Sequence, residues 1–182
     1  TATTMGKVLP AYGPRISWFD MECLLGPYSS SVALDSDDAQ APTSWSTTVQ
    51  NNLAGTPGPR TGLAPEEYER TGTPILSGSL NLPRYTADAL LNAWGANTVY
   101  MMRTRFTGPL IDATNRYQLT FYVNSLRLTQ ASATLGGAVA ANTPLLWFAQ
   151  KPAAQPAGFP TLSRLGALAV EVISTESQHV LL

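Results

Sequence analysis

The chain of 182 residues has few charged side chains, which make up only 13% of it. Ordinary soluble domains carry about 25%. The formal net charge is −1, so the composition indicates no general attraction to nucleic acid or to an anionic membrane. With 44% hydrophobic residues, the chain fits a subunit whose surface is largely covered by neighbours. The alternative is a monomer whose surface consists of Ser, Thr, Asn and Gln.

Cysteine and histidine are nearly absent. Cys23 is the only cysteine and lies among apolar residues, which excludes an intrachain disulfide and predicts a buried thiol. His179 is the only histidine and lies near the C-terminus, a poor position for the base of a catalytic triad. One His and one Cys do not make a usual zinc site. We therefore expect no catalytic residue, no metal and no cofactor.

Long apolar runs and phosphate-binding loops are also missing. No apolar stretch approaches the ~18 residues of a membrane-spanning helix, so we expect no membrane anchoring. Asp35, Asp37 and Asp38 lack the glycine and the later glutamate of a helix-loop-helix calcium site, so a solvated acidic loop is favoured. Glu66 and Glu67 are adjacent and cannot flank a glycosidic bond as a catalytic pair.

The clearest pattern present is a strand followed by a short helix. Leu76, Gly78, Leu80 and Leu82 alternate along the sequence, as in a half-buried strand that Pro83 ends. The next segment predicts a helix over residues 86–94, capped by Thr86 and ended by Gly95. Its apolar positions have helical spacing and should face the sheet. They are Ala87, Leu90, Leu91 and Trp94.

A long hairpin follows, with strands at Val99–Gly108 and Tyr117–Leu128 and a polar turn at Asp112–Asn115. The second strand changes phase within its length. Its first apolar face, expected on the core, comprises Tyr117, Leu119, Phe121 and Val123, whereas Leu126 and Leu128 are shifted by one residue. Because the side-chain period of a strand is two, either a bulge near Asn124-Ser125 or a change of strand partner is predicted.

The rest of the chain predicts strands separated by loops, in one domain covering residues 1–182. Residues 1–15 are expected to form an N-terminal arm. Residues 35–73 are expected to form a long irregular loop. Within that loop we expect a short strand at 43–49 and a helical turn at 65–70. Further strands are predicted at 16–25, less clearly at 29–34, at 145–148 and, as the last one, at 166–174, before an apolar tail at 179–182. The fold class is mainly β, a sandwich or barrel-like domain with one flanking helix and long loops.

The segments SGSLNLPRYTADALLNAW, MMRTRFTGPLI and NRYQLTFYVNSLRLTQ resemble tail tube (major tail) proteins of long-tailed bacteriophages. The resemblance implies a structural virion protein whose subunits form rings that stack into a tube for genome delivery. It implies contact with other tail proteins, with a tape-measure protein in the lumen, and with DNA only in transit. The expected location is the virion tail, after assembly in the host cytoplasm. By the same comparison, residues 35–73 would reach the next ring.

The residues proposed for the contact between subunits are Asp37, Trp45, Tyr68, Arg103 and Arg105. Arg103 and Arg105 share a strand face and could meet DNA phosphates or acidic groups of a neighbouring subunit. Ordinary salt bridges between subunits, or a solvated face, are favoured. Arg116 and Arg127 lie on or near the partner strand. Two other classes remain open: a different virion β-protein, such as a capsid decoration or tail terminator subunit, and a carbohydrate-binding β-sandwich. The latter would use the four tryptophans, Trp18, Trp45, Trp94 and Trp147.

Overall fold

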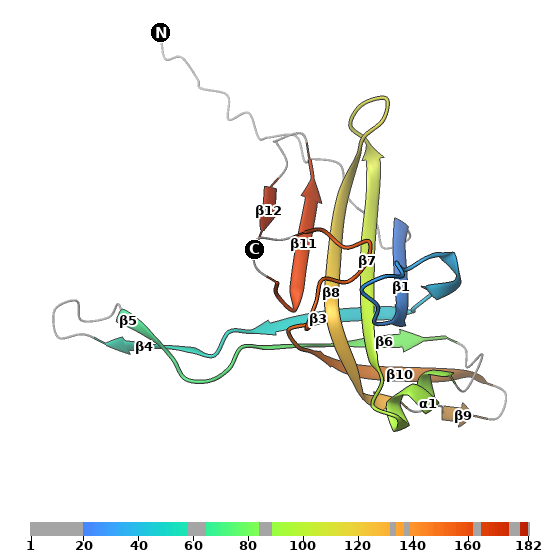
Figure 1. The fold of residues 1–182 in the computed structure, drawn as a ribbon, viewed down its shortest axis with the longest axis horizontal. Coiled ribbons are helices and arrows are strands. Elements are labelled where there is room, and N and C mark those ends of the chain that lie inside the picture. The colour runs from blue at the N-terminus through green and yellow to red at the C-terminus, as the bar shows by residue number, and fades with distance from the viewer. Residues whose placement is uncertain are drawn as a thin grey trace, which may run out of the picture.

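The computed structural model describes residues 20–57, 65–83, 89–131, 134–136, 139–161, 165–174 and 179–181. These residues form one antiparallel sheet of ten strands, a separate two-stranded hairpin and one short helix (Figure 1). The sheet strands are β1 (Met21–Pro27), β2 (Ala39–Gln40), β3 (Ser44–Gln50), β6 (Ile75–Leu82), β7 (Val99–Leu110), β8 (Arg116–Ala131), β9 (Thr134–Gly136), β10 (Val139–Ala149), β11 (Leu168–Ile173) and β12 (His179–Leu181). The separate hairpin is β4 (Leu53–Pro57) with β5 (Pro65–Arg70), and the helix is α1 (Ala89–Gly95). Among the described residues, no helix is long and apolar enough to cross a membrane.

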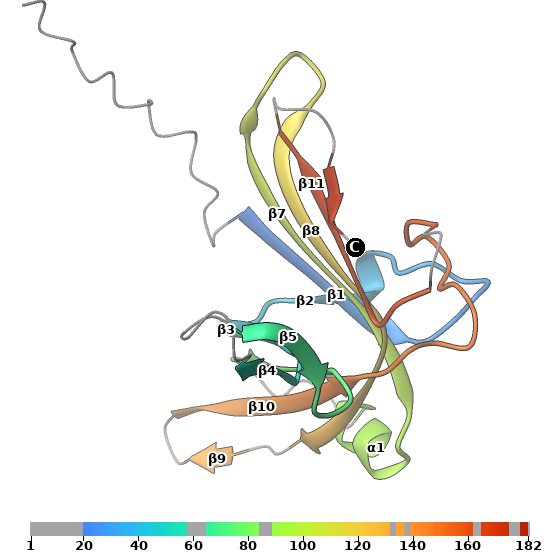
Figure 2. The ribbon, with the colours of Figure 1, turned by 90° about the vertical axis from the view of Figure 1, so that its left-hand side faces the viewer.

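The sheet folds over into two layers that share strand β8. One layer has the order β12-β11-β8-β7-β1-β2, and the other continues from β8 through β10 and β6 to β3. Figures 1 and 2 show the strands of the two layers crossing, with the lower part of β8 curving from one layer into the other. The mainly β, sandwich-like architecture predicted from the sequence is confirmed.

The phase change in β8 reflects both predicted causes. Met102 lies opposite Val123 while Tyr100 lies opposite Leu126, so Met101 faces the two residues Asn124 and Ser125. This is a β-bulge, which inserts one unpaired residue and re-aims the strand. The outer partner of β8 also changes here, from β11 along residues 118–123 to β10 along residues 126–131. The bulge therefore places Val123 and Leu126 in the same core, although they are three residues apart.

The main core lies between the two layers. The alternation predicted for β6 is confirmed, since Leu76, Leu80 and Leu82 are buried there and the strand ends before Pro83. Cys23 is also buried, and this burial raises the pKa of its thiol to about 11. The other large members of this core are Leu25, Tyr100, Met102, Val123, Leu126, Leu128, Leu145 and Trp147.

The face of β8 expected on the core is only partly within it. Val123 is fully buried, whereas Tyr117, Leu119 and Phe121 are half-buried. The Phe121 ring packs against Trp45, with centroids 5.2 Å apart, beyond the main core. Residues of the opposite face of β8 are buried as well, because loops cover that face, so burial does not follow a simple alternation along this strand.

A second, smaller core covers the outer face of the β1-β7-β8-β11 layer. The loops at residues 28–34 and 150–161 meet over it, and the Tyr28 hydroxyl joins them by donating to the Ala154 carbonyl at 2.8 Å. The expected strand at 29–34 is wrong: the Ser29 Oγ accepts hydrogen bonds from the amides of Ser31 and Val32, which makes a tight turn. The members of this core are Leu24, Leu34, Met101, Tyr122, Phe159 and Ala169.

Helix α1 packs beside β8, and the first part of the predicted helix, with Thr86 and Ala87, lies outside the described residues. Leu90 packs on the main core, as expected. The prediction for Trp94 is wrong, because its side chain is 44% exposed and Ala93 occupies the buried position. The Trp94 indole N–H instead donates to the Thr129 carbonyl at 3.1 Å, so the ring lies along the edge of β8.

The described residues of the region at 35–73 do not form an irregular loop. Strands β3 and β6 pair from Ser44 opposite Asn81 to Gln50 opposite Ile75, and the ladder resumes as β4–β5. The predicted strand at 43–49 is thus confirmed, and the helical turn at 65–70 is wrong because this segment is β5. Asn52 joins the two ladders in a left-handed backbone conformation, with a φ of 47°. Its side-chain amide donates to the Thr73 carbonyl at 2.7 Å. We call the projecting β4–β5 hairpin the arm (Figure 1).

Several predicted boundaries differ at the two ends of the chain. The first strand is β1, which continues to Pro27, while residues 1–19 lie outside the described part. The strand expected at 145–148 extends over Val139–Ala149 as β10. The strand predicted as the last one is β11, but the apolar tail contributes a further strand, β12, which pairs Val180 with Glu171.

Candidate assembly surfaces

Open strand edges are the first surface available to a neighbour. Among the described residues, β3 and β12 each pair along one side only, and β2 covers the outer side of β1 only at Cys23 and Leu24. β12 ends the layer β12-β11-β8-β7-β1-β2 on one side, and the two-residue strand β2, which in the described part of the chain leaves most of β1 unpaired on its outer side, ends it on the other. Unpaired N–H and C=O groups on such edges form a template for another strand. This layer therefore presents a free edge at each end.

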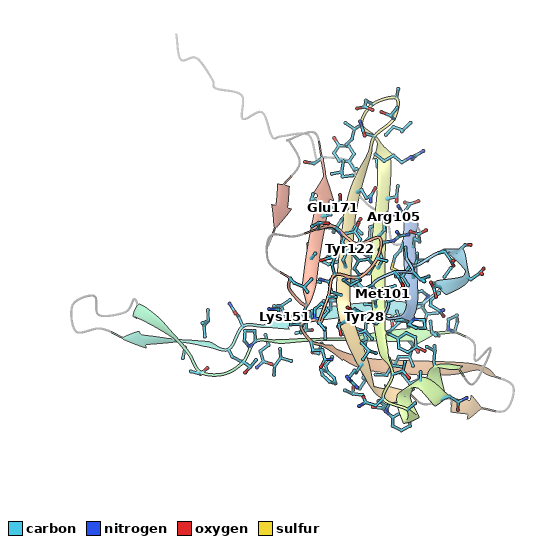
Figure 3. The ribbon with its side chains drawn as sticks, in the orientation of Figure 1. Tyr28, Met101, Arg105, Tyr122, Lys151 and Glu171 are labelled. Carbon is cyan, nitrogen blue, oxygen red and sulfur yellow. The ribbon has the colours of Figure 1, made fainter. Side chains whose placement is uncertain are left out.

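The outer face of the same layer carries a polar network next to the smaller core. Arg103 and Arg105, two of the proposed contact residues, both direct a guanidinium Nη2 at the Glu22 carboxylate, at 3.1 Å for Arg103. The Tyr122 hydroxyl donates to Glu171 at 2.8 Å. Burial, the bond to Glu171 and the negative charge of Glu171 raise the pKa of Tyr122 to about 12, although the two arginines act the other way. Figure 3 shows Arg105, Tyr122 and Glu171 on neighbouring strands.

The four arginines on β7 and β8, Arg103, Arg105, Arg116 and Arg127, do not gather into one basic patch. Arg103 and Arg105 are paired by Glu22 of their own chain, so their contact with a neighbouring subunit stays a prediction. Arg127 donates to the Asn97 carbonyl at 2.8 Å, and Arg116 reaches the Gly108 carbonyl at 3.5 Å. Each guanidinium therefore has a partner within the chain.

The remaining proposed contact residues are dispersed. Asp37 is exposed in a 3₁₀ turn at Ser36–Asp38, where its amide donates to Asp35. Trp45 on β3 is half-buried against Phe106 and Phe121, on the inner side of the layers. Tyr68 lies on the arm, and its side chain is outside the described residues. The proposed residues thus occupy several separate surfaces rather than one site.

The described tryptophans do not make a sugar-stacking platform. Trp147 is buried in the main core and Trp45 packs on other rings, which leaves only Trp94 with a largely exposed ring among those described. Trp18 lies outside the described residues. In the described part of the chain, no three His, Cys, Asp or Glu side chains come together as a metal site.

A turn held by side-chain hydrogen bonds ends the β7–β8 hairpin, at the Asp112–Asn115 segment predicted as a polar turn. The Asp112 carboxylate accepts from the backbone amides of Thr114 and Asn115, each at 2.8 Å, and from the Asn115 side chain at 2.8 Å. These hydrogen bonds, the Asn115 side chain first, hold the pKa of Asp112 well below its usual range. Beside this turn Leu110 is 55% exposed. We call Leu110, Ile111 and Asp112 the hairpin tip.

A groove of about 450 Å³ lies where the arm leaves the body. Its walls come from the ends of β3, β6 and β10 and from the start of β11. Val49 and Ile75 project into it as largely exposed side chains, and Lys151 is the one charged residue among those lining it. Ile75 is out of phase with the buried residues Leu76, Leu80 and Leu82 of β6, whereas Val49 lies opposite Leu76 at the end of β3, so strand alternation alone did not predict the groove. We call it the apolar groove.

No family model matches the chain, and no curated protein matches its sequence. The SPP1 tail tube structure, from solid-state NMR and cryo EM, matches with a TM-score of 0.51 at 10% identity, over 74% of this chain and 75% of that chain. A crystal structure of Hcp protein matches over 87% of this chain and 96% of that chain at 9% identity, but its TM-score of 0.47 supports no conclusion. At such low identity the likeness concerns fold alone. The chain has the fold of the SPP1 tail tube, as its sequence resemblance predicted.

Proposed function

We propose that this chain is a tail tube subunit, which assembles with copies of itself into rings stacked as a tube. The observation that supports this most is the layer β12-β11-β8-β7-β1-β2, which has an open edge at each end in a protein with a tail tube fold. A head-to-tail contact between such edges closes into a ring when the rotation between subunits allows it. The role is therefore structural rather than enzymatic.

Pairing β12 of one subunit with β1 of the next would continue the layer around a channel. Each new strand pair satisfies backbone donors and acceptors that a monomer leaves to water. The low charge of the chain fits such an assembly, because a surface covered by neighbours needs few charges. The channel would carry the genome, with a tape-measure protein in the lumen beforehand and other tail proteins at the tube ends.

The arm is proposed to contact a neighbouring subunit or ring. A two-stranded hairpin is at best marginally stable in water without a third strand or a packed face. The described part of the arm pairs only β4 with β5, and Leu53 on it is largely exposed. A neighbour that covers the arm would supply the missing packing. The proposed location of the protein is the tail of the virion, after assembly in the host cytoplasm.

The test is to replace residues 53–70 by an Asn-Gly turn, which joins the end of β3 to the strand leading back into β6. We expect tubes of the unaltered chain in negative-stain images, and for the shortened chain a folded body by circular dichroism with no tubes. Val32→Ser, which changes an exposed apolar side chain on a loop of the body, serves as the matched control and should leave tubes intact.

Two outcomes would contradict the proposal. If the unaltered protein stays monomeric at high concentration, the chain is not a self-assembling tube subunit. If the shortened protein forms tubes of normal length, the chain assembles but the arm has another purpose.

A further inference from the structure

The hairpin tip and the apolar groove lie far apart in one subunit. The start of β7 lies near the groove, because Val99 and Lys151 line a second hollow together and Lys151 also lines the groove. A strand rises about 3.3 Å per residue, so the far end of β7 at Leu110 lies roughly 35 Å along the strand from there. Figure 1 shows the turn at the end of the hairpin, and Figure 3 shows Lys151 well away from it, near the base of β11. The two surfaces cannot meet within one chain.

The two surfaces match in chemistry. The tip presents Leu110 as a largely exposed aliphatic side chain next to Ile111, and the groove presents Val49 and Ile75. The carboxylate of Asp112 gives the tip a negative charge, whereas Lys151 supplies the only charge among the residues lining the groove. Arg116, the other charged residue near the turn, reaches back to the Gly108 carbonyl on the hairpin itself. An apolar projection with a negative charge thus corresponds to an apolar hollow with a positive one.

We propose that the hairpin tip of one subunit inserts into the apolar groove of the next copy along the tube. The proposal rests on the proposed tube function and names the surfaces that join successive rings. Two different patches meet, so the contact is heterologous and repeats head to tail without limit, as a growing tube requires.

The build of the tip favours insertion. Four hydrogen bonds, from the backbone amides and the side chains of Thr114 and Asn115, reach the Asp112 carboxylate and fix the turn before it meets a partner. A preorganised projection loses less conformational entropy on binding than a mobile loop. The groove volume of about 450 Å³ lies within the usual range for ligand pockets and has room for aliphatic side chains.

Paired cysteines test the contact directly in the full chain. Two double variants place one cysteine on the tip and one on either wall of the groove: Leu110→Cys with Ile75→Cys, and Leu110→Cys with Val49→Cys. Disulfides form only when the two Cβ atoms come within about 3.5–4.5 Å. The native Cys23 stays silent, because burial raises its thiol pKa to about 11. We expect at least one pair to give a ladder of multimers on a non-reducing gel after mild oxidation of assembled tubes.

The matched control is Val32→Cys with Ile75→Cys, which moves the first cysteine to another exposed apolar side chain and should give no ladder. Lys151→Glu should raise the protein concentration needed for tube formation about two- to fivefold at low salt, the range of one partly exposed ion pair. Lys151→Arg should restore it.

The outcomes separate this inference from the proposed function. Tubes that form while neither tip–groove pair cross-links overturn the insertion and leave the tube function standing. Cross-linking by the Val32 control as strongly as by the tip pairs would also overturn it. An unaltered chain that never assembles overturns both.

Discussion

Two hairpins of this molecule have different surroundings although both are antiparallel ladders. β7–β8 is braced on both outer sides, by β1 next to β7 and by β11 and then β10 next to β8. β4–β5 forms a two-stranded sheet of its own. Side chains of β8 are buried on both faces along its middle, whereas Leu53 on β4 is largely exposed. The difference shows that strand pairing alone does not make a hairpin part of a core, because packing against neighbouring strands contributes most of the stability.

The comparison predicts that truncation of a leucine destabilises the β7–β8 hairpin strongly and the arm very little. Leu126 on β8 is 0% exposed and Leu53 on β4 is 48% exposed. Leu126→Ala should lower the free energy of unfolding of the monomer by about 2–5 kcal/mol, because it leaves a cavity in the main core. Leu53→Ala should change it by less than about 0.5 kcal/mol. Urea unfolding followed by circular dichroism gives both values, and equal losses would show that the arm belongs to the cooperative fold.

Tyr122, in the polar network on β8, makes the stability of the braced hairpin depend on pH in the alkaline range. The pKa of Tyr122 is raised from 10.0 to about 12 in the folded protein, by burial first and by Glu171 second. The folded state therefore holds this proton more tightly than the unfolded state. The resulting stabilisation is complete below pH 10 and is lost as the pH rises towards about 12.

Tyr122→Phe removes this titrating group while it keeps the ring in the smaller core. Denaturant unfolding between pH 9 and about pH 11, where the unfolded tyrosine ionises, should give a steeper loss of stability for the unaltered chain than for Tyr122→Phe. Parallel curves for the two proteins would exclude Tyr122 as the cause of the slope.

An effect between those of Leu126→Ala and Leu53→Ala is expected at Trp94, which lies at the margin of the braced hairpin. Trp94→Ala should cost about 1 kcal/mol, since the ring is largely exposed and loses one hydrogen bond to Thr129. A fully buried tryptophan would cost about 3–5 kcal/mol. Trp94→Phe retains most of the apolar contact and isolates the hydrogen bond. A loss as large as that of Leu126→Ala would mean that the helix and its tryptophan are part of the main core.

The braced region was largely predictable from the sequence, and the arm was not. Alternation along β6 and the phase change at Asn124-Ser125 are direct consequences of strand period, so they identified the buried face and the bulge. The arm misled prediction because proline at a first position and successive glutamates also suit a helix, and only pairing with β4 makes Pro65–Arg70 a strand. Trp94 has the spacing of a buried helical face, but its indole lies along the edge of β8, where its N–H donates to the Thr129 carbonyl. The assembly surfaces were not predictable from the sequence, because a surface such as the groove exists only after distant strand ends meet.

The β7–β8 hairpin also sets the order in which the chain can find its structure. Its strands are joined by the short turn at residues 111–115, whereas β1 pairs with β7, and β6 with β10, across long stretches of intervening chain. Closing those long loops costs entropy before any contact compensates for it, so folding by this topology is slow. The hairpin is the natural nucleus, and the later strands dock on a ladder that is already formed. Until they arrive its edges remain open to other chains, which makes the newly synthesised protein prone to wrong pairing.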